Sequence, residues 1–225
     1  MRGPVVAQGL LGAATVEKDL DEGLVAAHLG LAMALLALLL YIVGASARGQ
    51  RAESRGQGLR PLALVTSFFV LCTIVAGGYM AGTQNYGRAD YQVGDGAHHA
   101  CGKEFPTCNG EFMPFGEARL VDIHLTHRAF MYIATLLVLV LVVMTLRRRP
   151  GAGAVRSAWF AAAVLCSQVL VGALNVWLDE YEALIVLHLA LGTLLWMGVV
   201  SLALQLYPVS APVAERSRTP EAVPA

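Results

Sequence analysis

Five long apolar runs constrain the fold of this chain more than any other feature. Each is long enough to cross a bilayer as a helix, which takes about 20 mostly apolar residues, and they cover residues 24–43, 61–82, 121–146, 157–178 and 183–207. A sixth apolar stretch, residues 3–16, is too short to cross alone. Because lipid cannot satisfy exposed backbone polar groups, such runs form helices. We therefore expect an all-α, polytopic membrane protein.

The charged residues are few and segregated along the chain. They make up 14% of the sequence, against about a quarter in soluble domains, and no basic face remains that would indicate a nucleic-acid partner. One set of connections is basic (Arg48, Arg51, Arg55, Arg60, Arg147, Arg148, Arg149, Arg156, Arg216, Arg218), and the alternate set is acidic (Glu17, Asp19, Asp21, Glu22, Asp179, Glu180, Glu182). Basic connections face the cytoplasm. This pattern predicts a multi-pass protein of the cell membrane with the loop 83–120 outside and the C-terminus inside.

An internal repeat divides the chain. Residues 8–37 align without gaps on residues 168–197, and the matches include Gln, Gly, Asp and His as well as the leucines that lipid selects everywhere: Gln8 with Gln168, Gly12 with Gly172, Asp19 with Asp179 and His28 with His188. A helical hairpin with a histidine near the outer end of its second helix is therefore expected twice. We interpret residues 1–44 as the remaining hairpin of an N-terminal half, 45–60 as a cytoplasmic loop, 61–207 as a four-helix bundle and 208–225 as a disordered cytoplasmic tail.

Histidines inside the spans are the candidate functional residues, because an ionisable side chain in a membrane helix is costly. His127 and His188 each lie about 8–9 Å below the outer end of their helices, so the two share a depth. Two imidazoles at one height in a bundle suit the two faces of a heme, whose iron takes histidine axial ligands. Packing through hydrogen bonds between helices is the competing interpretation. Zinc would need more converging ligands than the spans offer.

Other polar residues near the outer end have more than one interpretation. Arg128 could pair with a heme propionate or extend its side chain to the interface. We expect His124 to be solvated at the interface and His98 and His99 to be exposed in the outer loop.

Cys101 and Cys108 share the outer loop, in a compartment where disulfides persist. Six residues separate them, and the turns expected at Gly102 and Pro106 allow the loop to close. A structural disulfide is expected, and a redox-active pair is the sharper alternative.

Taken together, these motifs resemble the heme A synthase family. The resemblance covers nearly the whole chain up to Tyr207 and includes the hairpin with Gln8 and His28, its echo with Gln168 and His188, the pair His127-Arg128, and the loop from Cys101 to Cys108. It implies eight helices in two pseudo-symmetric halves. The C-terminal half would bind heme b through His127 and His188 and carry the Cys101–Cys108 pair, and His28 would face the substrate, heme O.

The chain departs from this family pattern at its N-terminal end. The family's first hairpin, with the second substrate-side histidine and a catalytic glutamate, has no counterpart, so either the chain is a shortened version or its true start lies upstream. The position matching that glutamate in the second half is His124. No residue is therefore nominated as catalytic.

The resemblance implies oxidation of the C8 methyl of heme O to the formyl of heme A. The partners would be heme O synthase, cytochrome c oxidase assembly components and membrane lipid, and a homo-oligomer is left open. The alternatives are a non-catalytic bis-histidine heme b binder or electron carrier, and a thiol–quinone oxidoreductase using Cys101 and Cys108. The last leaves His28 and His188 unexplained.

Overall fold

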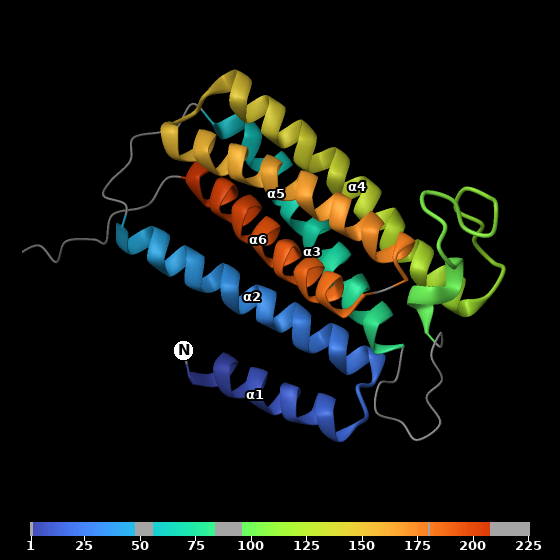
Figure 1. Ribbon diagram of the computed structural model, residues 1–225. Helices are drawn as coiled ribbons and strands as arrows, with labels where there is room; N and C mark the ends of the chain where they lie inside the picture. Colours follow the sequence, from blue (N-terminus) through green and yellow to red (C-terminus); the bar gives the residue numbers. More distant parts are fainter. Residues whose placement is uncertain (1, 48–55, 84–95, 180, 208–225) are drawn as a thin grey trace, which may run out of the picture.

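The fold is a membrane bundle of α-helices. The computed structural model describes residues 2–47, 56–83, 96–179 and 181–207, and within them the chain forms six α-helices and two short 3-10 helices (Figure 1). They are α1 (Arg2–Glu17), α2 (Glu22–Ala47), η1 (Gln57–Leu59), α3 (Arg60–Gly82), η2 (Ala97–Cys101), α4 (Arg119–Arg148), α5 (Ala152–Trp177) and α6 (Glu182–Leu206). The five helices from α2 to α6 are long and apolar enough to span a bilayer. The predicted fold class and the five predicted spans are therefore confirmed.

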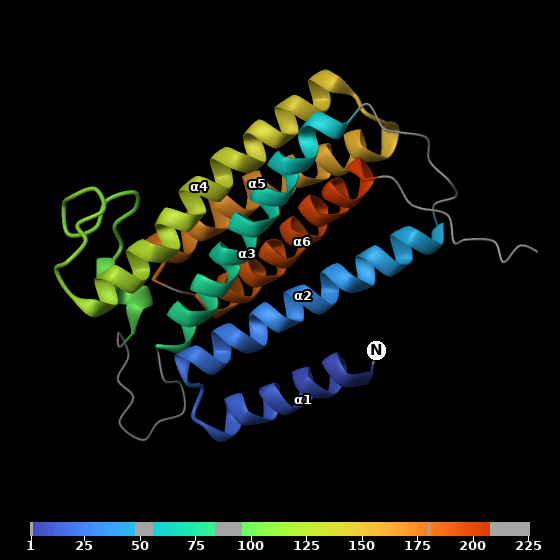
Figure 2. The same cartoon turned by 180° about the vertical axis from the view of Figure 1, so that it is seen from behind.

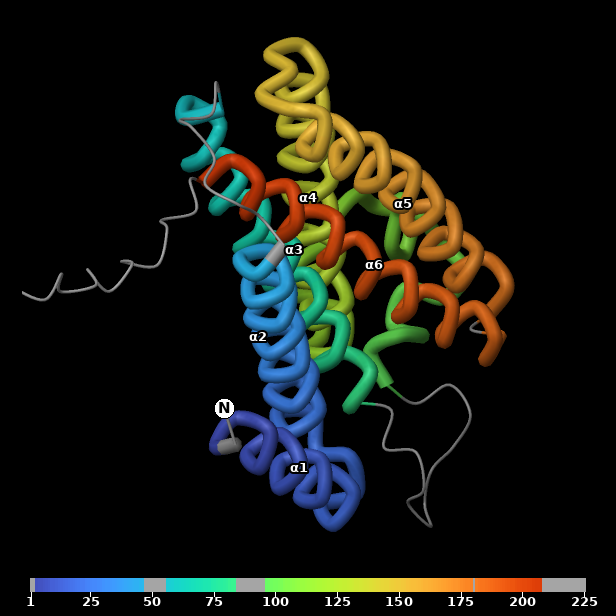
Figure 3. Tube along the Cα trace, turned by 90° about the vertical axis from the view of Figure 1, so that its left-hand side faces the viewer, coloured from blue at the N-terminus to red at the C-terminus, as the bar shows by residue number. Residues whose placement is uncertain are grey.

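Helices α3 to α6 form a four-helix bundle. Helix α3 packs against α4 and α6, and α5 packs against the same two helices. Helices α4 and α6 thus stand at opposite corners of the bundle, with α3 and α5 at the other two. Helix α2 lies along α3 and α6, and α1 packs mainly against α2 (Figures 2 and 3).

Small residues allow the helices of the bundle to approach closely. On α5, Ala154, Ala158 and Ala161 recur at helical spacing, and each is at most 3% exposed. Large apolar side chains point the other way, and Leu136, Trp159 and Val186 are all more than 60% exposed. Because lipid is the surrounding solvent, a membrane bundle places small residues between its helices and large apolar residues outside. The packing therefore matches a lipid-embedded bundle.

The hairpin of α1 and α2 is attached to the outside of this bundle. The indole Nε1 of Trp196 on α6 donates to the carbonyl of Met33 on α2 at 2.9 Å. Helix α1 has only 16 residues, or about 24 Å at 1.5 Å per residue, which is less than the roughly 30 Å of bilayer hydrocarbon. Val5 and Leu10 on α1 are more than 60% exposed. The N-terminal helix is short and largely uncovered.

The internal repeat is visible in the backbone. The turns between α1 and α2 and between α5 and α6 each contain an aspartate at a positive φ, 51° at Asp19 and 59° at Asp179. Such a conformation is uncommon outside glycine, and aspartate is among the residues that tolerate it. The two hairpins therefore share a left-handed aspartate at the matching position of their turns.

Some of the predictions from the sequence concern residues that the structure does not describe. The tail 208–225, most of the linker 45–60 and the stretch 84–95 of the predicted outer loop lie outside the described residues. The assignment of one side of the membrane to the cytoplasm stays a prediction. We refer to the end of the molecule at which α2, α4 and α6 begin as the loop end.

Candidate functional site

Three histidines lie near the loop end. His28 on α2, His127 on α4 and His188 on α6 each occur within about three turns of the first residue of their helix. The starts of α2 and α4 are held together by an ion pair between Glu22 and Arg119, with 2.6 Å between the charged atoms. The starts of α2 and α4 are thus close together, and all three histidines lie toward the loop end of the molecule.

Each of these imidazoles rests against a glycine of the preceding helix. The pairs are Gly12 with His28, Gly77 with His127, and Gly172 with His188. A Cβ added at these glycines would lie 2.9, 3.0 and 2.9 Å, respectively, from the Cε1 atom of the ring. Any other residue would push the ring away. We call this contact the glycine seat.

A polar group of the same preceding helix meets each ring. His127 donates through Nδ1 to the backbone carbonyl of Thr73 at 3.0 Å, which leaves Nε2 as the atom with the lone pair. The amide Nε2 of Gln168 lies 3.2 Å from Nε2 of His188. The amide Nε2 of Gln8 lies 3.2 and 3.3 Å from the two ring nitrogens of His28.

His127 and His188 form a pair across the bundle. They stand on the opposed helices α4 and α6, and each ring rests against the helix that precedes its own, α3 for His127 and α5 for His188. Within the described residues, Nδ1 of His188 is buried without a hydrogen-bond partner. An orphaned imidazole nitrogen is costly unless something occupies it. The chemistry of these two side chains fits a heme, whose iron they would hold.

A two-histidine site also limits the kind of metal. In the part of the chain that the structure describes, no group of three or more His, Cys, Asp or Glu side chains is placed to hold an ion. Zinc sites built by protein alone take three or four ligands, whereas a heme iron receives four nitrogens from its own macrocycle. The donor set suits heme better than a bare ion.

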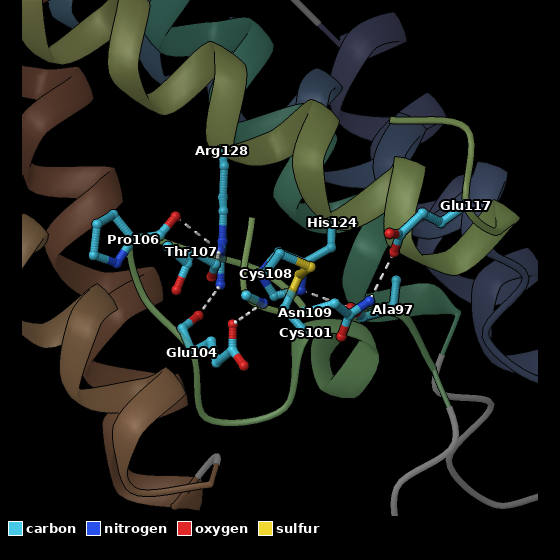
Figure 4. The surroundings of a disulfide bond; sticks show 11 residues. Ala97, Cys101, Glu104, Pro106, Thr107, Cys108, Asn109, Glu117, His124 and Arg128 are labelled. Atoms are coloured by element: carbon cyan, nitrogen blue, oxygen red, sulfur yellow. Dashed lines mark hydrogen bonds between the residues drawn. A yellow bond between two sulfur atoms is a disulfide. The ribbon is translucent and has the colours of Figure 1, made fainter. Parts of the chain in front are cut away.

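Arg128, next to His127, holds the loop that follows η2. It is 3% exposed, and its guanidinium donates to the carbonyls of Glu104 at 2.7 Å and Thr107 at 2.8 Å, with Pro106 at 3.5 Å (Figure 4). These carbonyls accept from the N–H groups of Arg128 that we expected to pair with a heme propionate. The pairing with heme stays a prediction, and the contact with the loop is what the structure shows.

The same loop contains the disulfide between Cys101 and Cys108 (Figure 4). Both cysteines are at most 1% exposed and pack with Val121 and Leu125 of α4. The disulfide therefore anchors the loop on the helix that carries His127. A redox role for the pair stays a prediction.

The expected exposure of three loop-end histidines is wrong. His124 is 4% exposed, and its Nδ1 lies 2.7 Å from the carbonyl of Ala97. His98 and His99 are partly buried, and Nδ1 of His99 lies 3.6 Å from a carboxylate oxygen of Asp179. The physical reason is that η2 folds back onto the start of α4, which removes these side chains from solvent.

Four residues of the site were not singled out for it from the sequence. Gln8 and Gln168 entered only as matches in the repeat, and Thr73 and Gly77 did not enter at all. Thr73 precedes Gly77 by four residues, as Gln8 precedes Gly12 and Gln168 precedes Gly172. A comparison of all three hairpins at this spacing would have identified them.

The fold and the paired histidines define a polytopic helical membrane protein with a bis-histidine site in its bundle. A comparison with protein families then gives a particular assignment, because residues 2–200 match the model of the cytochrome oxidase assembly protein family. The chain belongs to this family.

Curated relatives carry a more specific description. Proteins described as heme A synthase from Bacillus mycoides, Bacillus cereus and Bacillus anthracis are 25% identical to this chain over 157 residues, which is 69% of this chain and 47% of each relative. The chain thus spans about half the length of the curated relatives it matches. No solved structure matches it.

Proposed function

We propose that the chain binds heme b between His127 and His188 and acts in the formation of heme A for cytochrome c oxidase. The observation that carries this proposal is the pair of imidazoles on the opposed helices α4 and α6, each resting on a glycine seat, with a buried nitrogen of His188 that has no partner among the described residues. Membership of the cytochrome oxidase assembly family supports it. The description of the relatives as heme A synthase supports the reaction.

The proposed reaction is oxidation of the C8 methyl of heme O, through hydroxylation, to a formyl group. It removes four electrons and four protons and adds one oxygen atom at the level of water, so the electrons must pass to an acceptor outside this chain. When bound, heme iron supplies the redox chemistry. The residues of the chain orient the macrocycle and keep water away: the seats fix the rings of His127 and His188, and the loop held by Arg128 covers one end of α4. His28 on α2 is the proposed contact with the substrate heme O.

The setting follows from the same proposal. The chain would sit in the cell membrane with the disulfide loop on the extracytoplasmic side, where oxidising conditions preserve disulfides. It would receive heme O from heme O synthase and deliver its product to the assembly of cytochrome c oxidase. The many exposed apolar side chains on α4, α5 and α6 give it a lipid-facing surface.

Substitution of the paired histidines tests the heme site. We expect His127→Ala and His188→Ala each to remove the low-spin heme spectrum of the purified protein, because a six-coordinate iron needs both imidazoles. Reduced-minus-oxidised absorption spectra and heme content per chain are the measurements. His99→Ala is the control and should retain both. Full low-spin heme in the His127→Ala, His188→Ala double variant would contradict the proposal.

The reaction is tested separately from the site. The chain is co-expressed with a heme O synthase in a host without its own heme A, and the extracted hemes are separated by chromatography. Heme A is the expected product. Bound heme b without any heme A would retain the site but refute the activity.

A further inference from the structure

A glutamine stands at the same position in both copies of the repeat. Gln8 precedes Gly12 by four residues, and Gln168 precedes Gly172 by four. Residues four apart lie on one face of a helix, so each amide is one turn away from a glycine seat and on the same side. The distances of 3.2 Å from Gln8 to His28 and from Gln168 to His188 show that both amides reach the seated ring.

The third histidine has a different group at this position. Thr73 lies four residues before Gly77, and its backbone carbonyl accepts the Nδ1 hydrogen of His127. The hydroxyl of Thr73 is engaged elsewhere, since it donates to the carbonyl of Phe69 at 2.8 Å. All three rings therefore meet a polar group one turn before the seat, and only its chemistry varies.

Two buried atoms beside His188 have no partner among the described residues: Oε1 of Gln168 and Nδ1 of the imidazole itself. A histidine that ligates a metal through one nitrogen almost always donates its other N–H to a carbonyl, carboxylate or water. Rotation of the amide of Gln168 exchanges its N–H and C=O, so this side chain offers an acceptor as well as a donor.

We propose that Gln168 is a positioning residue for His188: its amide oxygen accepts the Nε2 hydrogen of this ring, as the Thr73 carbonyl accepts the Nδ1 hydrogen of His127, and leaves Nδ1 of His188 as the nitrogen for the metal. The inference rests on the proposed heme site and deepens it. Gln8 stands in the same relation to His28. Gln168 fixes the orientation of the imidazole and, by accepting its N–H, makes the ring a stronger electron donor to ferric iron.

The chain offers a matched control for a test of this role. Gln205 on α6 donates to the hydroxyl of Ser157 on α5 at 2.8 Å, so it joins the same two helices through the same amide chemistry without touching a histidine. The full-length protein and its variants Gln168→Leu, Gln168→Glu and Gln205→Leu are purified in detergent and titrated with hemin. Hemin affinity and the midpoint potential of the bound heme are recorded.

Gln168→Leu should weaken hemin binding about tenfold, the lower end of the range for loss of a metal ligand's hydrogen-bond partner, and should raise the midpoint potential. Gln168→Glu should lower the potential, because a carboxylate is the stronger acceptor. Gln205→Leu should change neither quantity.

Three outcomes would overturn the inference. The first is that Gln168→Leu and Gln205→Leu have the same hemin affinity and the same midpoint potential. The second is an unchanged midpoint potential in Gln168→Glu, and this result would refute the role of Gln168 even if the leucine variant fails to fold. Either result leaves the heme site itself standing. The third, a wild-type protein that binds no hemin, would overturn the proposed function as well.

Discussion

The hairpins α1/α2 and α5/α6 hold their histidines in the same way but in different surroundings. Both place glutamine, glycine and histidine in one register, and both turn through an aspartate at positive φ. Helix α5 packs against α4 and α6, whereas α1 packs mainly against α2. The comparison teaches that each hairpin supplies its own histidine with the same two contacts, a glycine and a glutamine amide. The neighbours of the hairpin decide whether the ring meets a second imidazole.

Substitution at the glycine seats gives the largest expected effect on heme binding, and its failure would show that the comparison of the two hairpins is wrong. A methyl group at Gly172 would lie 2.9 Å from Cε1 of His188, so Gly172→Ala must displace the ring. We expect a loss of about fivefold to a hundredfold in the affinity for heme b, because overpacking of this kind costs about 1–3 kcal/mol. Gly12→Ala displaces His28 alone and should leave the heme b content unchanged.

The measurement is heme content per chain by the pyridine hemochrome spectrum, with Gly151→Ala as the control. Gly151 also lies at α5, and an added Cβ there meets nothing within 4 Å. Equal losses of heme b in the Gly172 and Gly12 variants would show that the two hairpins serve one site.

The next prediction concerns the loss of stability when Arg128 is replaced. Its guanidinium donates to the carbonyls of Glu104 and Thr107 in the disulfide loop, and Arg128→Met would remove both hydrogen bonds. We expect a loss of about 3 kcal/mol in the free energy of unfolding, because hydrogen bonds to a charged group contribute about 1.5–3 kcal/mol each. Denaturant unfolding followed by circular dichroism measures it. An unchanged midpoint would show that solvent or lipid replaces these contacts.

The disulfide gives the smallest effect. Replacement of Cys101 and Cys108 by serine frees a loop of eight residues, and the loop-closure model gives about 2 kcal/mol for a loop of that size. We expect heme binding to persist at saturating hemin, because the loop contacts α4 and leaves both axial histidines in place. Complete loss of heme in the double variant would assign the cysteines a direct part in the site.

The apolar pattern of the sequence was sufficient to predict the fold. The five runs match α2 to α6 closely, because lipid imposes length and hydrophobicity on every span. The repeat likewise indicated the histidines and their shared register. The spans and the repeat depend on residues that are close together in the sequence, so they can be predicted from the sequence alone.

The contacts of the loop end could not be predicted in this way. Burial of His124 and the contacts of Arg128 depend on how η2 and the disulfide loop fold back onto α4. Such tertiary contacts join residues with no common periodicity. The contact between the Thr73 carbonyl and His127 could not be predicted for another reason. Every residue has a backbone carbonyl, so the residue type does not indicate which one accepts a hydrogen bond.

The position of α2 outside the bundle has a consequence for electron flow. Helix α2 packs against α3 and α6, so a group held by His28 would lie outside the bundle that encloses His127 and His188. Electrons passing between the two places would have to cross α3 or α6.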